Sequence, residues 1–341
     1  MDRLYCTFAD MVADLSPTTG GDEAAWMGHI REASRLIEEA FHAPFIPYAE
    51  IKHFDGSGER MLKLTTPLLE ITGTIMNWTT ALTSADYLPT PCDRMWPNGP
   101  YTCFETAPLA PHMAVWLEFK DGVVVPGLWG LSEEIIDTGV TVQNTTKQAA
   151  ADKTLLVADG SKLSAGMVLF LDSLEQELIT ATGAPTAGVT TLSQAMGVAD
   201  DVLTPANVAA ANVGEMIRVD FEKMKIVDIN TTQWSVYRNW NKTKAAAHLA
   251  AANVDVYRTF TVSRGVNGTT PADHLNGVEI FRYVPPADIG LLAKACAALA
   301  KKLADSQYAG RTGDAQLGQV FYNDVVNKAQ LEQAQENYQW K

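Results

Sequence analysis

Residues 264–277 read RGVNGTTPADHLNG, and residues 238–251, which lie 26 positions earlier, read RNWNKTKAAAHLAA. In register the two stretches share Arg, Asn, Thr, Ala, His and Leu, six matches in fourteen positions, where average composition would give about one. A second repetition has a spacing of 48 residues, because Gly166 and Asp172 recur as Gly214 and Asp220. The sequence therefore predicts a partial duplication within a β-rich region.

The shared polar residues of the motif could have either a catalytic or ligand-binding role or a structural one. They are Arg238, Asn241 and His248 in one copy, and Arg264, Asn267 and His274 in the other. Histidine and arginine can act as general bases or as ligands. No cysteine or second histidine stands at a metal-ligand spacing, however, and no nucleophile motif accompanies them.

A structural role explains the motif more simply. Asn267-Gly268 favours a turn because both residues tolerate positive φ, and Thr269 can cap the chain that follows. We therefore predict a strand, a turn and a further strand, twice, with the arginine and histidine side chains hydrogen-bonded to loop carbonyls. Catalysis and contact with a neighbouring subunit are the alternatives.

The composition limits the classes of protein that fit. The chain has 341 residues, of which 47% are apolar, so a sizeable core is expected. Its net charge of −14 argues against coating a phosphate backbone and is compatible with a basic protein partner. The four cysteines form no C-x-x-C pair, and the N-terminus lacks the pattern of a signal peptide. We expect a soluble protein with no membrane association, made in a reducing compartment.

Two segments have helical periodicity, and the rest is mostly β. The first, near residues 22–41, places Trp26, Ile30, Ala33, Ile37 and Phe41 on one face. The second, residues 286–310, repeats Ile289, Leu292, Cys296, Leu299 and Leu303 at spacings of three and four.

The predicted fold is α+β. It is a small helical bundle, made of the N-terminal and C-terminal long helices, with an inserted and partly duplicated β-rich barrel or sandwich domain. The expected domains are residues 1–110, a helical part with a β-hairpin, residues 111–285, the β-rich insertion, and residues 286–341, the second helix and a tail.

Motifs of enzymes and cofactor sites are missing from the sequence. It contains no phosphate-binding glycine loop, no G-x-S-x-G, no H-E-x-x-H and no calcium-loop pattern. Acidic pairs such as Glu38-Glu39 are typical of solvated faces. We therefore expect no enzymatic activity, no catalytic residue, no cofactor and no metal.

Two parts of the sequence resemble head–tail connector (adaptor) proteins of tailed bacteriophages. Residues 30–73, IREASRLIEEAFHAPFIPYAEIKHFDGSGERMLKLTTPLLEITG, share with them a helix ending in an aromatic residue, then an extended run with Asp-Gly and a PLL. Residues 155–180, LLVADGSKLSAGMVLFLDSLEQELIT, and residues 262–289, VSRGVNGTTPADHLNGVEIFRYVPPADI, look like the β module that such proteins insert before their last long helix. The chain departs from that pattern in its extra residues, which include the copy with Arg238 and His248.

The resemblance implies a structural virion protein, made in the host cytoplasm and located at the capsid vertex. About twelve identical subunits would form a ring below the portal that extends the DNA channel and joins the capsid to the tail. The implied partners are other copies of the chain, the portal protein, and a tail-completion or tail-terminator protein, while DNA passes through without specific binding.

The resemblance also assigns roles to residues. The ring core would use Trp26, Ile30, Ile37, Phe41, Ile289, Leu292, Leu299 and Leu303. The portal-docking tail would use Val320, Phe321, Tyr322, Tyr338 and Trp340. The alternative function is a carbohydrate- or surface-binding β module, as in a decoration or tail-associated protein, suggested by the aromatic-rich stretch 87–104.

Overall fold

The computed structural model describes residues 4–6, 23–41, 44–90, 100–131, 135–144, 146–172, 175–179 and 183–283. The described part of the chain is mostly β and contains one α-helix, α2 (Glu23–Phe41). The expected helical bundle is therefore wrong: large antiparallel sheets, rather than paired helices, organise the chain. The second helix of that expectation, residues 286–310, lies outside the described residues.

A first antiparallel sheet is built from β1 (Tyr48–Phe54), β2 (Met61–Ile71), β3 (Met76–Asn77), β4 (Thr80–Ala81), β5 (Tyr87–Thr90), β6 (Tyr101–Thr106) and β7 (Val123–Trp129). Strand β7 pairs with β1, β2 and β3. The sheet thus extends past the domain boundary expected at residue 110, because β7 lies at its centre. Its core contains Phe54, Leu68, Phe104, Trp116 and Trp129, all buried.

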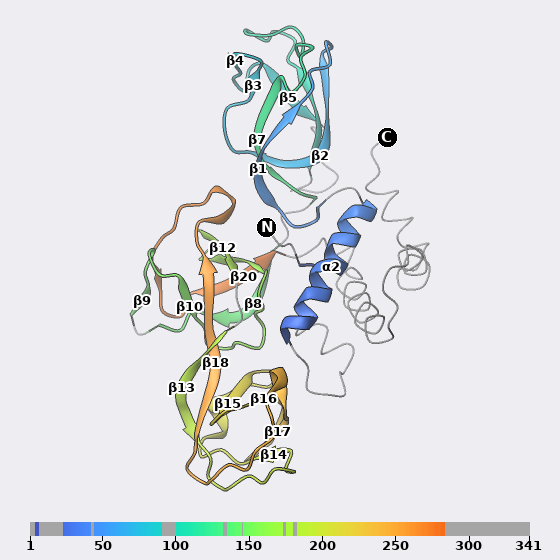
Figure 1. Cartoon of the computed structure of the whole chain (residues 1–341). Coiled ribbons are helices and arrows are strands. Elements are labelled where there is room, and N and C mark those ends of the chain that lie inside the picture. Colours follow the sequence, from blue (N-terminus) through green and yellow to red (C-terminus); the bar gives the residue numbers. More distant parts are fainter. Residues whose placement is uncertain are drawn as a thin grey trace, which may run out of the picture.

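A second antiparallel sheet has eleven strands. They are β8 (Ile135–Thr141), β10 (Thr154–Leu156), β11 (Val168–Leu171), β12 (Glu175–Ile179), β13 (Ala184–Thr191), β14 (Val202–Leu203), β15 (Met216–Val219), β16 (Glu222–Ile229), β17 (Trp234–Tyr237), β18 (Asn253–Ser263) and β20 (Glu279–Tyr283). Strands β9 (Lys147–Gln148) and β19 (His274–Leu275) form a separate pair. Figure 1 shows this part as two bodies connected by the long strand β18.

These two bodies are copies of one fold, with the second copy inserted into the first. We define module 1 as residues 135–179 with residues 258–283, and module 2 as residues 184–257. Hairpin β11–β12 of module 1 corresponds to hairpin β15–β16 of module 2. The backbone bond from Gly166 N to Ile179 O at 2.5 Å recurs from Gly214 N to Ile226 O at 2.8 Å.

The strand pairings repeat in the same register. Thr154 pairs with Thr261 in module 1, as Val202 pairs with Ser235 in module 2. The strands of the first half are displaced by +47 to +50 residues, for example +48 from Thr154 to Val202 and +47 from Leu178 to Lys225, and those of the second half by −26. Displacements of opposite sign mean that module 2 lies between the two halves of module 1. The predicted duplication is therefore present and complete in topology.

The inserted module is held to its host by β18 and by a buried carboxylate. The first half of β18 pairs with β13 and β15 of module 2, and its second half pairs with β10 and β12 of module 1. Glu215 of module 2 is fully buried and accepts bonds from Arg258 Nε at 2.7 Å and Arg258 Nη2 at 2.8 Å. It also accepts from Gly160 N of module 1 at 3.0 Å. A continuous strand and a shared ion pair thus fix the two modules relative to each other.

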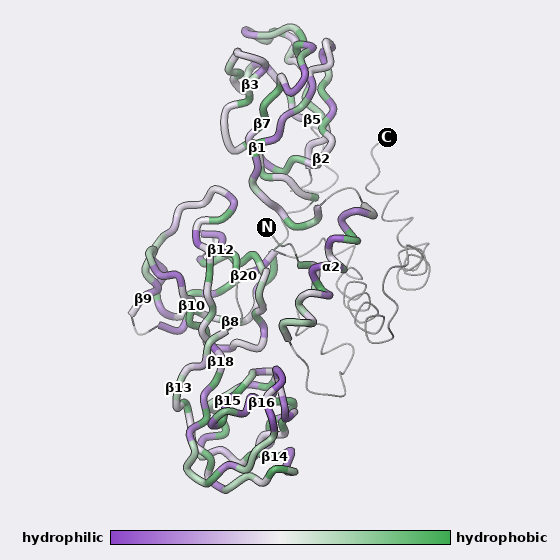
Figure 2. The backbone as a smooth tube through the Cα atoms, viewed as in Figure 1, coloured by the Kyte–Doolittle hydropathy of each residue, from purple (hydrophilic) through white to green (hydrophobic). Residues whose placement is uncertain are grey.

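Helix α2 packs its apolar face inside the chain. Ile30 and Ile37 are buried in one cluster with Phe45, Trp240 and Tyr283, and Trp26 lies against it. The face expected to form a ring wall thus belongs to a core cluster that also contains residues of both modules. Figures 1 and 2 show α2 beside the two modules. The other residues of the expected ring core lie outside the described side chains; they are Phe41, Ile289, Leu292, Leu299 and Leu303.

The nested arrangement predicts that module 1 folds without module 2. In module 2 the residues 230–233 connect β16 to β17, and Asn230 Oδ1 accepts from the backbone N–H groups of Thr232 at 3.0 Å and Gln233 at 2.8 Å. Replacing residues 183–259 with this Asn-Thr-Thr-Gln turn should close module 1. We expect the shortened chain to unfold cooperatively in scanning calorimetry, because the buried core of module 1 consists of residues that the deletion leaves in place, such as Leu155, Leu169 and Ile280. A broad, non-cooperative transition would mean that the modules fold as one unit.

Candidate functional site

Each module contains a buried cluster of one arginine, one glutamate and one histidine. In module 2, Arg238 donates to both oxygens of Glu222, from Nε at 2.9 Å and from Nη2 at 2.5 Å. Glu222 is buried and also accepts from Ala246 N at 3.0 Å, while His248 Nε2 lies 3.0 Å from its Oε2. A buried carboxylate is stable only with such a set of donors.

Module 1 contains the same cluster. Arg264 donates to both oxygens of the buried Glu175, and His274 Nε2 lies 2.9 Å from Glu175 Oε2. The backbone N–H groups of Gly265 and Ala272 donate to the same carboxylate at 3.1 and 3.2 Å. The structure therefore brings four of the six predicted motif residues into two equivalent clusters, together with Glu175 and Glu222, which the sequence reasoning missed.

The arginines hold loops by hydrogen-bonding their carbonyl oxygens, as predicted. Arg264 donates to Ala149 O and to Ala272 O, the latter at 2.9 Å. Arg238 donates to Ala246 O at 2.5 Å and to three carbonyls of residues 197–200. The histidines differ from the prediction, because their ring nitrogens bond carboxylates instead of loop carbonyls. His248 bonds both Glu222 and Asp220.

The other motif residues form the turn after each arginine. Asn267 has a φ of 56°, and Asn241 has a φ of 50°, so both occupy the left-handed region that asparagine tolerates better than most residues. The Thr269 hydroxyl donates to Val266 O at 2.8 Å, and the Thr243 hydroxyl donates to Trp240 O at the same distance. The predicted turn is therefore confirmed in both copies.

Asn267 additionally connects module 1 to the first sheet. Its side-chain oxygen accepts from Ala49 N at 3.0 Å, and its amide nitrogen donates to Pro47 O at 3.3 Å and to Gln176 Oε1 at 2.7 Å. One turn residue thus joins β1 of the first sheet to β12 of module 1. The loop held by the Arg264 cluster is also the joint between these two parts.

The surroundings of the two glutamates keep them ionised. Burial alone would raise the pKa of Glu175, but hydrogen bonds from Arg264, His274 and the Ala272 N–H outweigh it, and the net pKa is lowered. For Glu222 burial acts in the same direction and is likewise outweighed by Arg238, together with Ala246 N–H and His248. These contributions to stability are lost only when the pH falls through the lowered values.

Glu177 is a buried ionisable residue of module 1 that has an apolar counterpart in module 2. Strand alternation places its side chain on the same face as Glu175, and it is fully buried. Arg264 Nε lies against it, yet neither carboxyl oxygen receives a hydrogen bond of suitable geometry. Burial, and then the charge of Glu175, raises its pKa to about 7, against the attraction of Arg264. Module 2 has the buried apolar Met224 at the equivalent position.

The carboxylates at the centre of the two clusters are bound by groups of the chain. Glu175 and Glu222 are buried, and each accepts hydrogen bonds from an arginine and from backbone N–H groups and lies within hydrogen-bond distance of a histidine. Among the described residues, no group of three or more His, Cys, Asp or Glu side chains is arranged to hold a metal ion. The arrangement can therefore fix loops, and we assign the motif a structural role.

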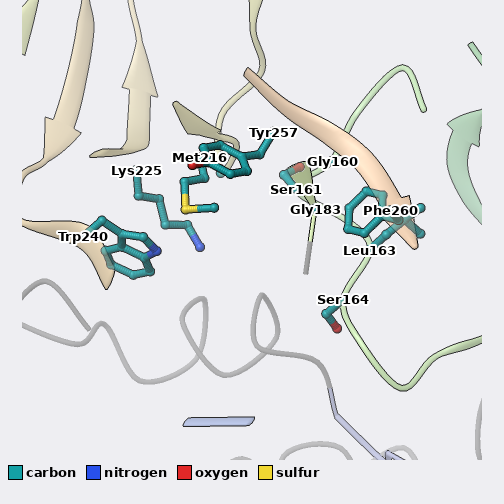
Figure 3. Close-up of a pocket in the computed structure, with 11 residues that line it drawn as sticks. Gly160, Ser161, Leu163, Ser164, Gly183, Met216, Lys225, Trp240, Tyr257 and Phe260 are labelled. Carbon is teal, nitrogen blue, oxygen red and sulfur yellow. The ribbon is translucent and has the colours of Figure 1, made fainter. Parts of the chain in front are cut away.

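A cavity of about 50 Å³ lies between the modules (Figure 3). Its lining includes Ser161, Leu163 and Ser164 of module 1, Met216, Lys225 and Trp240 of module 2, and Tyr257 and Phe260 on β18. The Ser164 hydroxyl is buried without a hydrogen-bond partner. This volume suits one or a few water molecules and is too small for a cofactor.

The remaining predicted residues are not gathered into a site. In the aromatic-rich stretch, Tyr87 packs edge-on against the buried Phe104, with ring centroids 5.3 Å apart, and both belong to the core of the first sheet. The five residues of the expected portal-docking tail lie outside the described residues, namely Val320, Phe321, Tyr322, Tyr338 and Trp340. In the part of the chain that the structure describes, no helix is long and apolar enough to cross a membrane.

Comparisons with known protein families, with curated proteins and with solved structures give no match. The functional argument therefore depends on the geometry and on the sequence motifs.

The buried ion pairs predict a large loss of stability when one partner is removed. Arg238→Ala leaves the Glu222 carboxylate buried without its cation, so we expect the free energy of unfolding to fall by about 3–5 kcal/mol. Arg35→Ala on α2 is the control, because the side chains of Arg35 and of its partners Glu32 and Glu39 are 54%, 45% and 58% exposed. The control should lose far less, because exposed ion pairs contribute little to stability. Urea denaturation measures both, and equal losses would contradict the assigned role.

Glu177 predicts an unusual dependence of stability on pH. Because its pKa is raised to about 7, the native state holds a proton that the unfolded chain has released, and stability falls as the pH rises from about 4.5 to about 7. Glu177→Met copies Met224 of module 2 and removes this dependence. At pH 8 the variant should be more stable than the parent by on the order of 3 kcal/mol, with a much smaller difference at pH 4.5.

Urea titrations at the two pH values test this prediction. A variant that is less stable than the parent at pH 8 would show that Glu177 is ionised and well paired.

Proposed function

We propose that the protein is a structural virion component of the head–tail connector type, which joins a capsid vertex to a tail as one subunit of a ring. The proposal rests on what the residues of the repeated motif contact in the structure. Arg264, Asn267 and His274, within the segment that resembles connector proteins, all hold loops and the joint to the first sheet. The residues that carry the resemblance are thus scaffold residues, which is what a structural subunit requires.

The arrangement of the β bodies supports such a role. The first sheet, module 1 and module 2 follow one another along the molecule, with α2 beside them (Figure 1). Asn267 fixes the first joint, and β18 with the Glu215–Arg258 pair fixes the second. A subunit built this way offers an extended surface to several neighbours, and repetition of two different patches around an axis closes a ring.

The charge also suits a DNA channel. The sequence has 40 acidic and 26 basic residues, so a ring of such subunits is strongly acidic. An acidic channel wall repels phosphate groups, which lets DNA pass without binding. In this proposal the partners are further copies of the chain, the portal protein and a tail-completion or tail-terminator protein.

The ring contacts that we propose exclude the apolar face of α2, since that face is buried within the subunit. Docking on the portal through the C-terminal segment, residues 320–340, remains part of the proposal. The carbohydrate-binding alternative was suggested by the aromatic-rich stretch that begins at Tyr87 and ends at Phe104. These two rings pack on each other, and Phe104 is buried, so this pair does not support that alternative.

The test is assembly with the portal protein encoded in the same genome. Full-length chain and portal would be mixed and studied by light scattering and by cryo-electron microscopy. We expect a closed ring of this chain on one face of the portal, and a chain shortened after residue 319 should not bind. A monomer that ignores the portal, and that is missing from purified particles by mass spectrometry, would overturn the proposal.

A further inference from the structure

Trp78 stands at a backbone position that disfavours a bulky residue. It is the first of two residues that connect β3 to β4, whose pairing ends at Asn77 and Thr80. Its φ is 59°, in the left-handed region where hairpin turns favour glycine or asparagine. Strained residues of this kind persist where the side chain has a function that offsets the cost.

About half of the Trp78 surface is also left exposed to solvent. Trp78 is 51% exposed, and its indole stacks on the ring of Phe119, itself 44% exposed, with ring centroids 4.4 Å apart and an angle of 20° between the planes. Leu117, on the same loop as Phe119, is 39% exposed. Trp78 N donates to Gly122 O at 2.6 Å, which holds the turn against that loop. We name Trp78, Phe119 and Leu117 the aromatic tip.

The aromatic tip has an acidic rim. Glu118 precedes Phe119 and Asp121 follows it two positions later, and Asp55 Oδ1 accepts a hydrogen bond from Asp121 N at 2.7 Å. All three carboxylate residues are exposed, and Lys120 is the basic residue among them. Strands β3 and β4 lie at the end of the first sheet that points away from the two modules (Figure 1). The tip is therefore free to meet another molecule.

We propose that the aromatic tip is a docking site for a cationic segment of a partner protein. An arginine or lysine side chain would lie over the outer face of the Trp78 indole, where a cation is attracted by the ring. Neighbouring basic residues would pair with Asp55, Glu118 and Asp121, and Leu117 would contact an apolar side chain of the same segment. Phosphate groups are repelled by the rim.

A second copy of this chain is a poor occupant of the aromatic tip. The chain carries a net charge of −14, so the same patch on another copy would bring like charges together. The inference stands apart from the connector role, because it concerns the chemistry of the tip alone.

Tryptophan indole N–H signals of the ¹⁵N-labelled full chain test the proposal. The probes are a five-residue peptide of alternating arginine and leucine, the matching glutamate–leucine peptide, and maltohexaose. Only the arginine peptide should shift the Trp78 signal, with a dissociation constant in the millimolar range that weakens severalfold at about 0.5 M salt. A shift with the sugar alone, or with none of the probes, would overturn the proposal.

Trp78→Gly separates binding from stability. Glycine relieves the positive φ, so the melting temperature should not fall, while peptide-induced shifts in the rest of the spectrum should vanish. Phe119→Ala should weaken binding severalfold as a second variant. Leu109→Ala is the control, because Leu109 is 93% exposed and lies outside the aromatic tip. A large fall in the melting temperature of Trp78→Gly, or unchanged binding by both tip variants, would show that Trp78 serves the fold.

If the ring forms on the portal but no peptide binds, the connector role stands and the docking site is refuted. If the peptide binds but no ring forms, the docking site stands and the connector role is refuted.

Discussion

The fold of the two modules depends on one interaction, the buried pair of an arginine and a glutamate. Glu175 and Glu222 are completely buried, and a carboxylate in that position is tolerated only when donors surround it. Each arginine donates two hydrogen bonds to its glutamate, and it also donates to carbonyl oxygens of nearby loops. The ion pair therefore fixes where the loops lie, and the loop after Arg264 in turn fixes the first sheet through Asn267.

The nested duplication explains how the two modules are joined to each other. Inserting a copy of a β module into a connection of its host leaves both ends of the insert close together, and here the return strand β18 serves both copies. The Glu215–Arg258 pair stabilises that junction. The arginine and histidine side chains of the repeated motif bind carboxylates and carbonyl groups of the chain itself.

Part of the fold and of the buried clusters can be predicted from the sequence, and the rest is missed for physical reasons. The repeated motif and the turn at Asn267-Gly268 are predictable from local chemistry, and both are present. The nesting is also visible in the sequence. Gly166 and Asp172 of module 1 have their counterparts later in the chain, whereas Arg264 of module 1 has its counterpart, Arg238, earlier in the chain. The glutamates were missed because the turn before Glu222 is one residue shorter than the turn before Glu175, which breaks the 48-residue spacing. The helical bundle was wrong because the apolar stripe of α2 does not reveal whether a helix or a sheet covers it.

Site-resolved hydrogen exchange of the Arg238→Ala variant tests the central claim most directly. The amides of Asn239 and Ala246 donate to Glu222, as those of Gly265 and Ala272 donate to Glu175. If each ion pair holds its own module, Asn239 and Ala246 should lose protection while Gly265 and Ala272 keep theirs. Unchanged protection at all four amides, or an equal loss at all four, would contradict the account.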